Sequence, residues 1–189
     1  MARRVYAFEN PDRFVAGAVG QPGSRAFYLQ AREGTRVVTA ALEKVQVALL
    51  AERLTQLLAE MRSRGADVPE EPPVDAVDRA PLEEPLVETF RVGTMAIVWD
   101  GDDDTVVVEA REITEDEGEE EAPEAEEAAA EDADENGDLM RVRLEPSRAL
   151  AFAARALEVV AAGRPPCPFC GQPLNPEGHI CTRRNGYMH

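Results

Sequence analysis

The sequence is poor in the residues that usually carry catalysis. It has two histidines, three cysteines and a single tryptophan among 189 residues, and Lys44 is the only lysine. Both histidines lie near the carboxyl end, and no glycine-rich loop that could cradle a phosphate precedes Lys44. The only candidate serine nucleophiles are Ser24, Ser63 and Ser147, and carboxylates are too abundant to single out an acid–base pair. These absences argue against an enzyme.

Long apolar runs are absent as well. No stretch reaches about 18 consecutive apolar residues, so we expect no segment to span a membrane. The start at Met1–Tyr6 lacks the apolar core of a signal peptide, which predicts a cytoplasmic protein. Hydrophobic residues still make up 44% of the chain, enough for a core. A chain of this length is expected to form one domain, or two small ones tightly joined.

Most of the net negative charge comes from one segment. The formal net charge is −17, but residues 115–138 alone hold 14 acidic side chains and no basic one. Without those 14 charges the net charge is −3, which is ordinary for a globular surface. Like charges at this density repel one another, so we predict that residues 115–138 form a disordered insertion in a hairpin. It could bind a basic partner, mimic nucleic acid, or only increase solubility.

Two helices are predicted. Between Leu42 and Arg64 the apolar residues recur at helical spacing and form one stripe. They are Val47, Leu50, Leu54, Leu57, Leu58 and Met61. The second helix runs over 144–160, where Pro146 suits the first helical position because that position needs no N–H donor. We therefore expect the helices to begin near Lys44 and Pro146.

The segments that precede the two helices resemble each other. Phe14–Gly17 matches Phe90–Gly93, and Leu29–Glu33 matches Val108–Glu112, in the same order. An ancient duplication would explain these matches, and chance in a chain rich in alanine and valine is the alternative. The predicted strands are 4–8, 13–20, 26–32, 35–41, 87–99, 105–113 and 139–144.

These patterns predict an α+β fold of two similar units, each an antiparallel strand meander followed by a helix. The first unit covers 1–65 and the second covers 86–163, and we expect one merged sheet with both helices on one side. Residues 66–85 contain five prolines, so they are predicted to be an extended linker over the surface. Residues 164–189 form the tail.

Alternation within two strands predicts which side chains face the core. Phe27, Leu29 and Ala31 should share one face, because side chains in a strand alternate between its two sides. Phe90, Val92, Thr94, Ala96 and Val98 should likewise share a face in the later strand. Residues 100–104 hold four aspartates, but their spacing lacks the distal glutamate of a calcium loop, so a solvated hairpin tip is the preferred interpretation.

The tail carries the strongest chemical motif. Cys167, Cys170, His179 and Cys181 follow the pattern C-x2-C-x8-H-x-C. Three thiolates and one imidazole in so short a span favour a closed tetrahedral site for structural zinc. Such a site would substitute for a hydrophobic core that a short tail cannot build. The sequence therefore predicts a C-terminal zinc knuckle.

Several alternatives stay open for the tail. A disulfide would leave one cysteine over, a redox C-x-x-C would need no third thiol or histidine, and the motif could have lost its metal. His189 could replace His179 as the fourth ligand. Arg183, Arg184 and Tyr187 could contact nucleic acid, although two arginines are weak support for that function.

The chain resembles an actinobacterial family defined only as a domain of unknown function. The likeness lies in the run from Cys167 to His179, in Cys181, in Arg184–Tyr187, and in two earlier segments, Phe8–Gly17 and Leu42–Val47. It covers nearly the whole chain apart from the acidic insertion. The resemblance supplies no activity.

Family members are often encoded beside kinase-like and histidine-phosphatase-like proteins, which implies a role as a partner or accessory protein. Thr182 stands where the family has proline, and Met188–His189 replaces a basic pair, so binding of a polyanion by the extreme tail is less expected. Three functions follow as hypotheses: a zinc-stabilised interaction or regulatory module with an unknown protein partner, an enzyme with a site between the repeats, and a nucleic-acid-binding protein.

Overall fold

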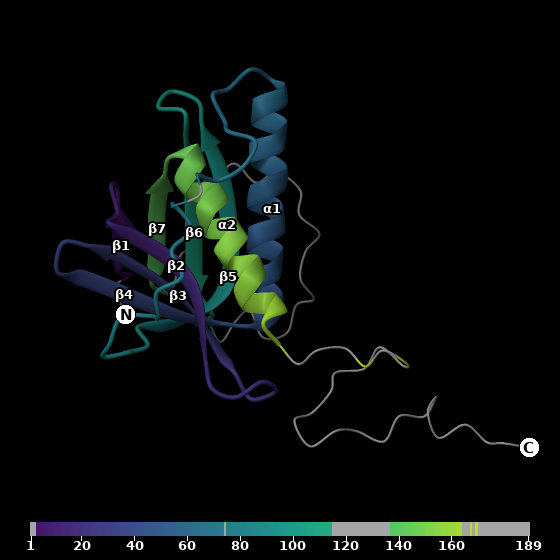
Figure 1. Ribbon diagram of the computed structural model, residues 1–189. Helices are drawn as coiled ribbons and strands as arrows, with labels where there is room; N and C mark the ends of the chain where they lie inside the picture. The colour runs from purple at the N-terminus through teal and green to yellow at the C-terminus, as the bar shows by residue number, and fades with distance from the viewer. Residues whose placement is uncertain (1–2, 74, 115–136, 164–166, 168, 170–189) are drawn as a thin grey trace, which may run out of the picture.

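The computed structural model describes residues 3–73, 75–114, 137–163, 167 and 169. These residues form an α+β fold with one mixed sheet and two helices (Figure 1). The elements are β1 (Val5–Phe8), β2 (Arg13–Val19), β3 (Ala26–Glu33), β4 (Arg36–Leu42), α1 (Lys44–Ser63), β5 (Phe90–Asp100), β6 (Thr105–Glu112), β7 (Leu139–Leu144) and α2 (Pro146–Ala161). Neither helix combines the length and the apolar character needed to cross a membrane, within the residues the structure describes.

Among the described residues, the sheet has seven strands in the order β1-β7-β6-β5-β4-β3-β2. Strands β2–β4 and strands β5–β7 each form an antiparallel meander, and each meander is followed by one helix. A short parallel pairing of β4 with β5, at Ala40–Phe90 and Ala41–Arg91, joins the two halves. Figure 1 shows β2–β4 crossing β5–β7 at a steep angle, so the sheet is strongly bent. A common ancestry of the two halves stays a prediction.

The first strand does not belong to the first meander, so that expectation was wrong. β1 pairs in parallel with β7, from Val5–Leu139 to Phe8–Val142. Phe8 is fully buried, and the Arg36 guanidinium lies 4.3 Å from the centre of its ring. The local pattern of side chains does not indicate which strands pair when the segments are far apart in the chain. For this reason the prediction from sequence misplaced this strand.

Both helices begin where the sequence predicts. α1 starts at Lys44 behind a capping box, in which the Glu43 N–H donates to Gln46 Oε1 at 2.8 Å. Gly65 follows α1 with a φ of +99°, the left-handed conformation that ends many helices. α2 starts at Pro146. The two helices lie side by side against the sheet (Figure 1).

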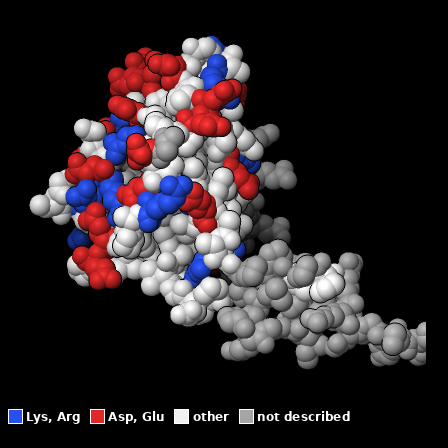
Figure 2. Space-filling model, viewed as in Figure 1, with Lys and Arg blue, Asp and Glu red and all other residues white. Residues whose placement is uncertain are grey.

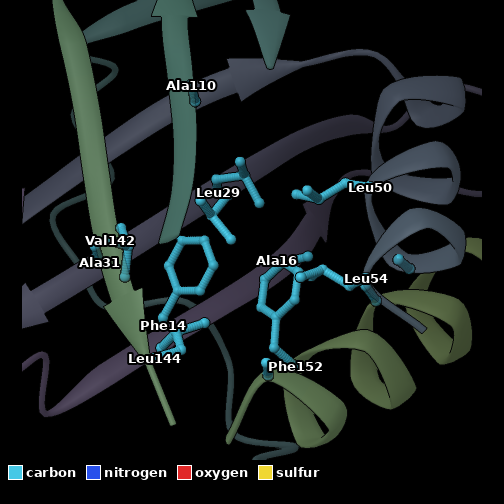
Figure 3. Packing of buried hydrophobic residues seen from close by; sticks show 14 of the residues in the cluster. Phe14, Ala16, Leu29, Ala31, Leu50, Leu54, Ala110, Val142, Leu144 and Phe152 are labelled. Atoms are coloured by element: carbon cyan, nitrogen blue, oxygen red, sulfur yellow. The ribbon is translucent and has the colours of Figure 1, made fainter. Parts of the chain in front are cut away.

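A single hydrophobic core fills the space between the bent sheet and the helices. The rings of Phe14 and Phe152 stack with their centres 4.4 Å apart, which joins β2 to α2. Leu54 of α1 and Leu29 of β3 are both fully buried beside them (Figure 3). Burying an aromatic or leucine side chain stabilises a fold by roughly 1.5–3 kcal/mol, so this junction holds the two halves together. The predicted inward face of β3 is confirmed.

The predicted face of β5 is only partly correct. Phe90 and Val92 are buried, but Thr94, Ala96 and Val98 are exposed. The register with β6 shifts between Val92 and Met95, because a β-bulge inserts one extra residue there. One extra residue exchanges the two faces of a strand, so the inward side chains beyond the bulge are Met95, Ile97 and Trp99.

The connecting segment 66–85 has no helix or strand among its described residues, and its last part covers the sheet. We call residues 78–85 the strap. The buried Gln30 side chain donates to the Glu83 carbonyl at 3.1 Å and accepts from the Glu83 N–H at 2.7 Å. Leu82 lies so close to Gly17 that a Cβ there would be 2.6 Å from it. The strap therefore covers part of the outer face of β2 and β3.

Candidate functional site

A cavity of about 220 Å³ lies where β2, the connecting segment and α2 meet. It therefore lies between the two halves of the chain. Its apolar wall includes the stacked rings of Phe14 and Phe152. Its charged lining consists of Arg13, Arg148, Arg155, Asp12 and Asp78.

Arg155 is the most deeply buried of the charged groups. Its side chain is 6% exposed, and its Nε donates to the Ala16 carbonyl of β2 at 2.7 Å. Its Nη2 donates to the Ala80 carbonyl at 2.7 Å, and its Nη1 donates to the main-chain carbonyl and the carboxylate of Asp78. β2 is an edge strand, so this guanidinium satisfies a carbonyl that no neighbouring strand could reach. Arg155 thus fastens the strap and α2 to the sheet edge.

Arg13 and Asp78 form the second part of this junction. The Arg13 Nε donates to Asp78 Oδ2 at 2.5 Å, and its Nη2 donates to Asp78 Oδ1 at 3.2 Å. The hydrogen bond from Arg13 lowers the pKa of Asp78 below its usual value, so this carboxylate stays ionised. Burial lowers the pKa of Arg155, and the charge of nearby Arg13 lowers it further, against the opposing effect of Asp78. Two guanidinium groups, those of Arg13 and Arg155, therefore share the carboxylate of Asp78 at this junction.

Arg148 differs from the other two arginines. Its Nη2 donates to the Pro11 carbonyl, and it forms no ion pair with a carboxylate of the described chain. Asp12, which also lines the cavity, accepts the Gly34 N–H at 2.6 Å. Arg148 therefore contributes positive charge that no described carboxylate neutralises.

The cavity wall lacks the usual catalytic groups. Among its described lining residues there is no histidine, cysteine, serine or lysine. Both aspartates accept hydrogen bonds from the protein, and Asp78 is held ionised by Arg13. A carboxylate stabilised in this way is a weak general base, because its proton affinity is reduced.

The few charged residues of the second helix were a feature of the sequence that could have indicated this cavity. The predicted second helix is apolar apart from Arg148, Arg155 and Glu158. Charged residues on a helix that is buried on several sides must find partners, and these three do. Two of them line the cavity, and Glu158 pairs with Arg79 at 2.6 Å.

The predicted metal site lies mostly outside the described residues. Cys167 is 5% exposed, and the Phe169 N–H lies 3.5 Å from its sulfur. Cys170, His179 and Cys181 are outside the part of the chain that the structure describes. The described residues contain no group of three or more side chains placed to hold a metal ion. The zinc site therefore stays a prediction.

Other predicted features have separate outcomes. At the tip of the β5–β6 hairpin, Asp100 pairs with Arg143 at 2.6 Å, and Asp103 lies 3.5 Å from the same guanidinium. A calcium loop needs carboxylates that are available to bind the cation, whereas these two pair with an arginine. Residues 115–136 of the acidic insertion, as well as Arg183 and Arg184, lie outside the described residues.

Comparison with known proteins gives a family but no activity. A search of curated proteins and a search of solved structures each found no match. One family matches residues 6–181, which is nearly the whole chain. The chain therefore belongs to DUF3090, a family described as protein of unknown function.

Proposed function

We propose that this protein is a non-catalytic binding module whose C-terminal tail is stabilised by structural zinc. The observation that carries the proposal is the composition of the cavity between the halves. Its buried arginines are used in internal hydrogen bonds, and its described wall has no histidine, cysteine, serine or lysine. A module of this kind would act by binding, either through the cavity or through its surface.

The donor set of the tail supports zinc. Two thiolates separated by two residues can be presented by one tight turn. The Phe169 N–H that approaches the Cys167 sulfur is the kind of contact that orients a thiolate ligand. Cys170, His179 and Cys181 complete a set of four, which matches a closed structural site. When bound, the metal would hold the tail together.

Metal analysis of the purified full-length chain tests the zinc part. We expect one zinc ion per chain, no bound zinc in Cys170→Ser, and strongly reduced zinc in His179→Ala. His189→Ala is the matched control, because it removes the other histidine and should leave the stoichiometry unchanged. Unaltered zinc content in Cys170→Ser would show that the ligand assignment is wrong.

An enzyme is the second candidate, because the cavity lies between the halves, where a catalytic site would be expected. Asp12 is then the most plausible base, since Asp78 is paired with arginine. A hydrolase or transferase activity that disappears in Asp12→Asn, with an unchanged melting temperature, would overturn the non-catalytic proposal. We expect no such activity.

A protein partner is part of the same proposal. Charge complementarity favours a basic partner for the acidic insertion, and the kinase-like and phosphatase-like proteins implied by the family resemblance are the first to test. The face drawn in Figure 2 carries basic side chains interspersed with acidic ones instead of a continuous basic patch, which gives nucleic acid no support there. Capture of one stoichiometric partner, lost on deletion of residues 115–136, is the expected result.

A further inference from the structure

We propose that the cavity between β2, the strap and α2 binds a small organic acid, with its carboxylate on Arg148 and its apolar part against Phe14 and Phe152. This inference rests on the proposed binding function and names the ligand class. Its basis is geometric: a partly open volume, an arginine with unused donors, and an aromatic wall occur in the same cavity.

The volume limits the ligand to a small molecule. A volume of about 220 Å³ corresponds to about seven water molecules at ~30 Å³ each in the liquid. That is below the ~300 Å³ at which drug-sized sites begin, so a nucleotide or a peptide would not fit. A carboxylic acid with a body of about one ring or a short branched chain matches the space.

Arg148 supplies the recognition of charge. A guanidinium has five N–H donors, and only the bond from Nη2 to the Pro11 carbonyl is formed by Arg148 within the described chain. The donors that remain can bind both oxygens of a carboxylate, the geometry that arginine favours. Arg13 and Arg155, by contrast, are held by Asp78 and by main-chain carbonyls. Arg148 is therefore the residue on which the anion would bind.

The charges of the wall favour a monoanion over a phosphate dianion. Three arginines and two aspartates line the cavity, which leaves one positive charge. A single carboxylate neutralises that charge. A dianion would add a second negative charge close to Asp12 and Asp78, and these carboxylates would repel it. The stacked rings of Phe14 and Phe152 also offer contact to an apolar body and nothing to a bare phosphate.

The test uses the full-length protein as purified and three probes: benzoate, benzamide and inorganic phosphate. Binding is measured by calorimetry and by amide shifts in ¹H–¹⁵N spectra. We expect saturable binding of benzoate with shifts centred on the cavity residues. Benzamide, which has the ring without the charge, and phosphate, which has the charge without the ring, should each bind at least about tenfold more weakly.

Two variants and a control separate the proposal from a structural effect. Arg148→Gln should weaken benzoate binding at least about tenfold, whereas Arg53→Gln, the same charge change on the exposed face of α1, should leave it within about twofold. If Arg148→Gln does not fold, Ala151→Leu serves in its place, because it fills the cavity without changing a charge and should abolish binding.

The outcomes distinguish this inference from the proposed function. Absence of saturable benzoate binding, equal binding by Arg148→Gln and the unmodified chain, or phosphate binding as tight as benzoate would each overturn the ligand assignment. None of these results affects the zinc stoichiometry or the capture of a partner, so the proposed function would still stand on those measurements. An activity lost in Asp12→Asn would instead overturn the proposed function.

Discussion

Replacing Arg155 with alanine should produce one of the largest losses of stability available from a single substitution outside the apolar core. The side chain is 6% exposed and donates to carbonyl oxygens of Ala16, Asp78 and Ala80, as well as to the Asp78 carboxylate. Removing the guanidinium takes the donor away from the Ala16 and Asp78 main-chain carbonyls, at about 1–3 kcal/mol for each unsatisfied group, whereas the Asp78 carboxylate keeps its hydrogen bonds from Arg13. We therefore expect Arg155→Ala to lower the free energy of unfolding by about 3–5 kcal/mol.

The loss should be visible in both urea and thermal unfolding. For a domain of this size, about 1 kcal/mol corresponds to about 2–4 °C, so the melting temperature should fall by roughly 6–20 °C. Arg155→Lys keeps the charge but not the planar fork that spans two carbonyls, so about 1–3 kcal/mol is expected. The control is Arg79→Ala, whose pair with Glu158 is exposed to solvent and should contribute little to the free energy of unfolding. An Arg155→Ala effect no larger than that of the control would refute the role assigned to this arginine.

Two further predictions concern the strap. The pKa of Asp78 is lowered in the folded state by Arg13, so its stabilising effect is present above the usual carboxyl pKa of 3.8 and is lost as the pH falls through the folded value. Urea unfolding should therefore show Asp78→Asn less stable than the unmodified chain at pH 7, with the difference shrinking below about pH 4; a gap that persists at low pH would contradict the ion pair. Gly17→Ala places a Cβ 2.6 Å from Leu82 and should lower the free energy of unfolding by about 1–3 kcal/mol, with faster amide exchange in the strap. Gly101→Ala, where the nearest Trp99 atoms are 3.9 Å away, is the neutral control, and equal effects of the two substitutions would rule out the close contact with the strap.

Much of the local structure was predictable, because it depends on chemistry within a few residues. Pro146 marks the start of α2, and its analogy to Lys44 placed the start of α1 correctly. The inward face of β3 followed from alternation alone. The predicted inward face of β5 is wrong beyond one bulge, because a single extra residue reverses the direction of every side chain that follows it.

The candidate site was far less predictable than the elements that build it. Arg13, Asp78 and Arg148 come from three segments that approach one another only after the sheet bends and α2 packs on β2. No spacing rule links residues so far apart in the chain. The charged positions on an otherwise apolar helix were the one available signal, and they pointed to buried partners without naming them.

The sequence by itself determined the two helices, the strand meanders that precede them and the family of the chain, because each depends on periodicity, capping or a contiguous motif. Only the tertiary structure decided that β1 completes the second half and that the strap covers the first. It also decided that three arginines meet at one cavity. The physical reason is that hydrogen bonds and ion pairs across long chain separations are fixed by how the elements pack, and local residue patterns do not encode that packing.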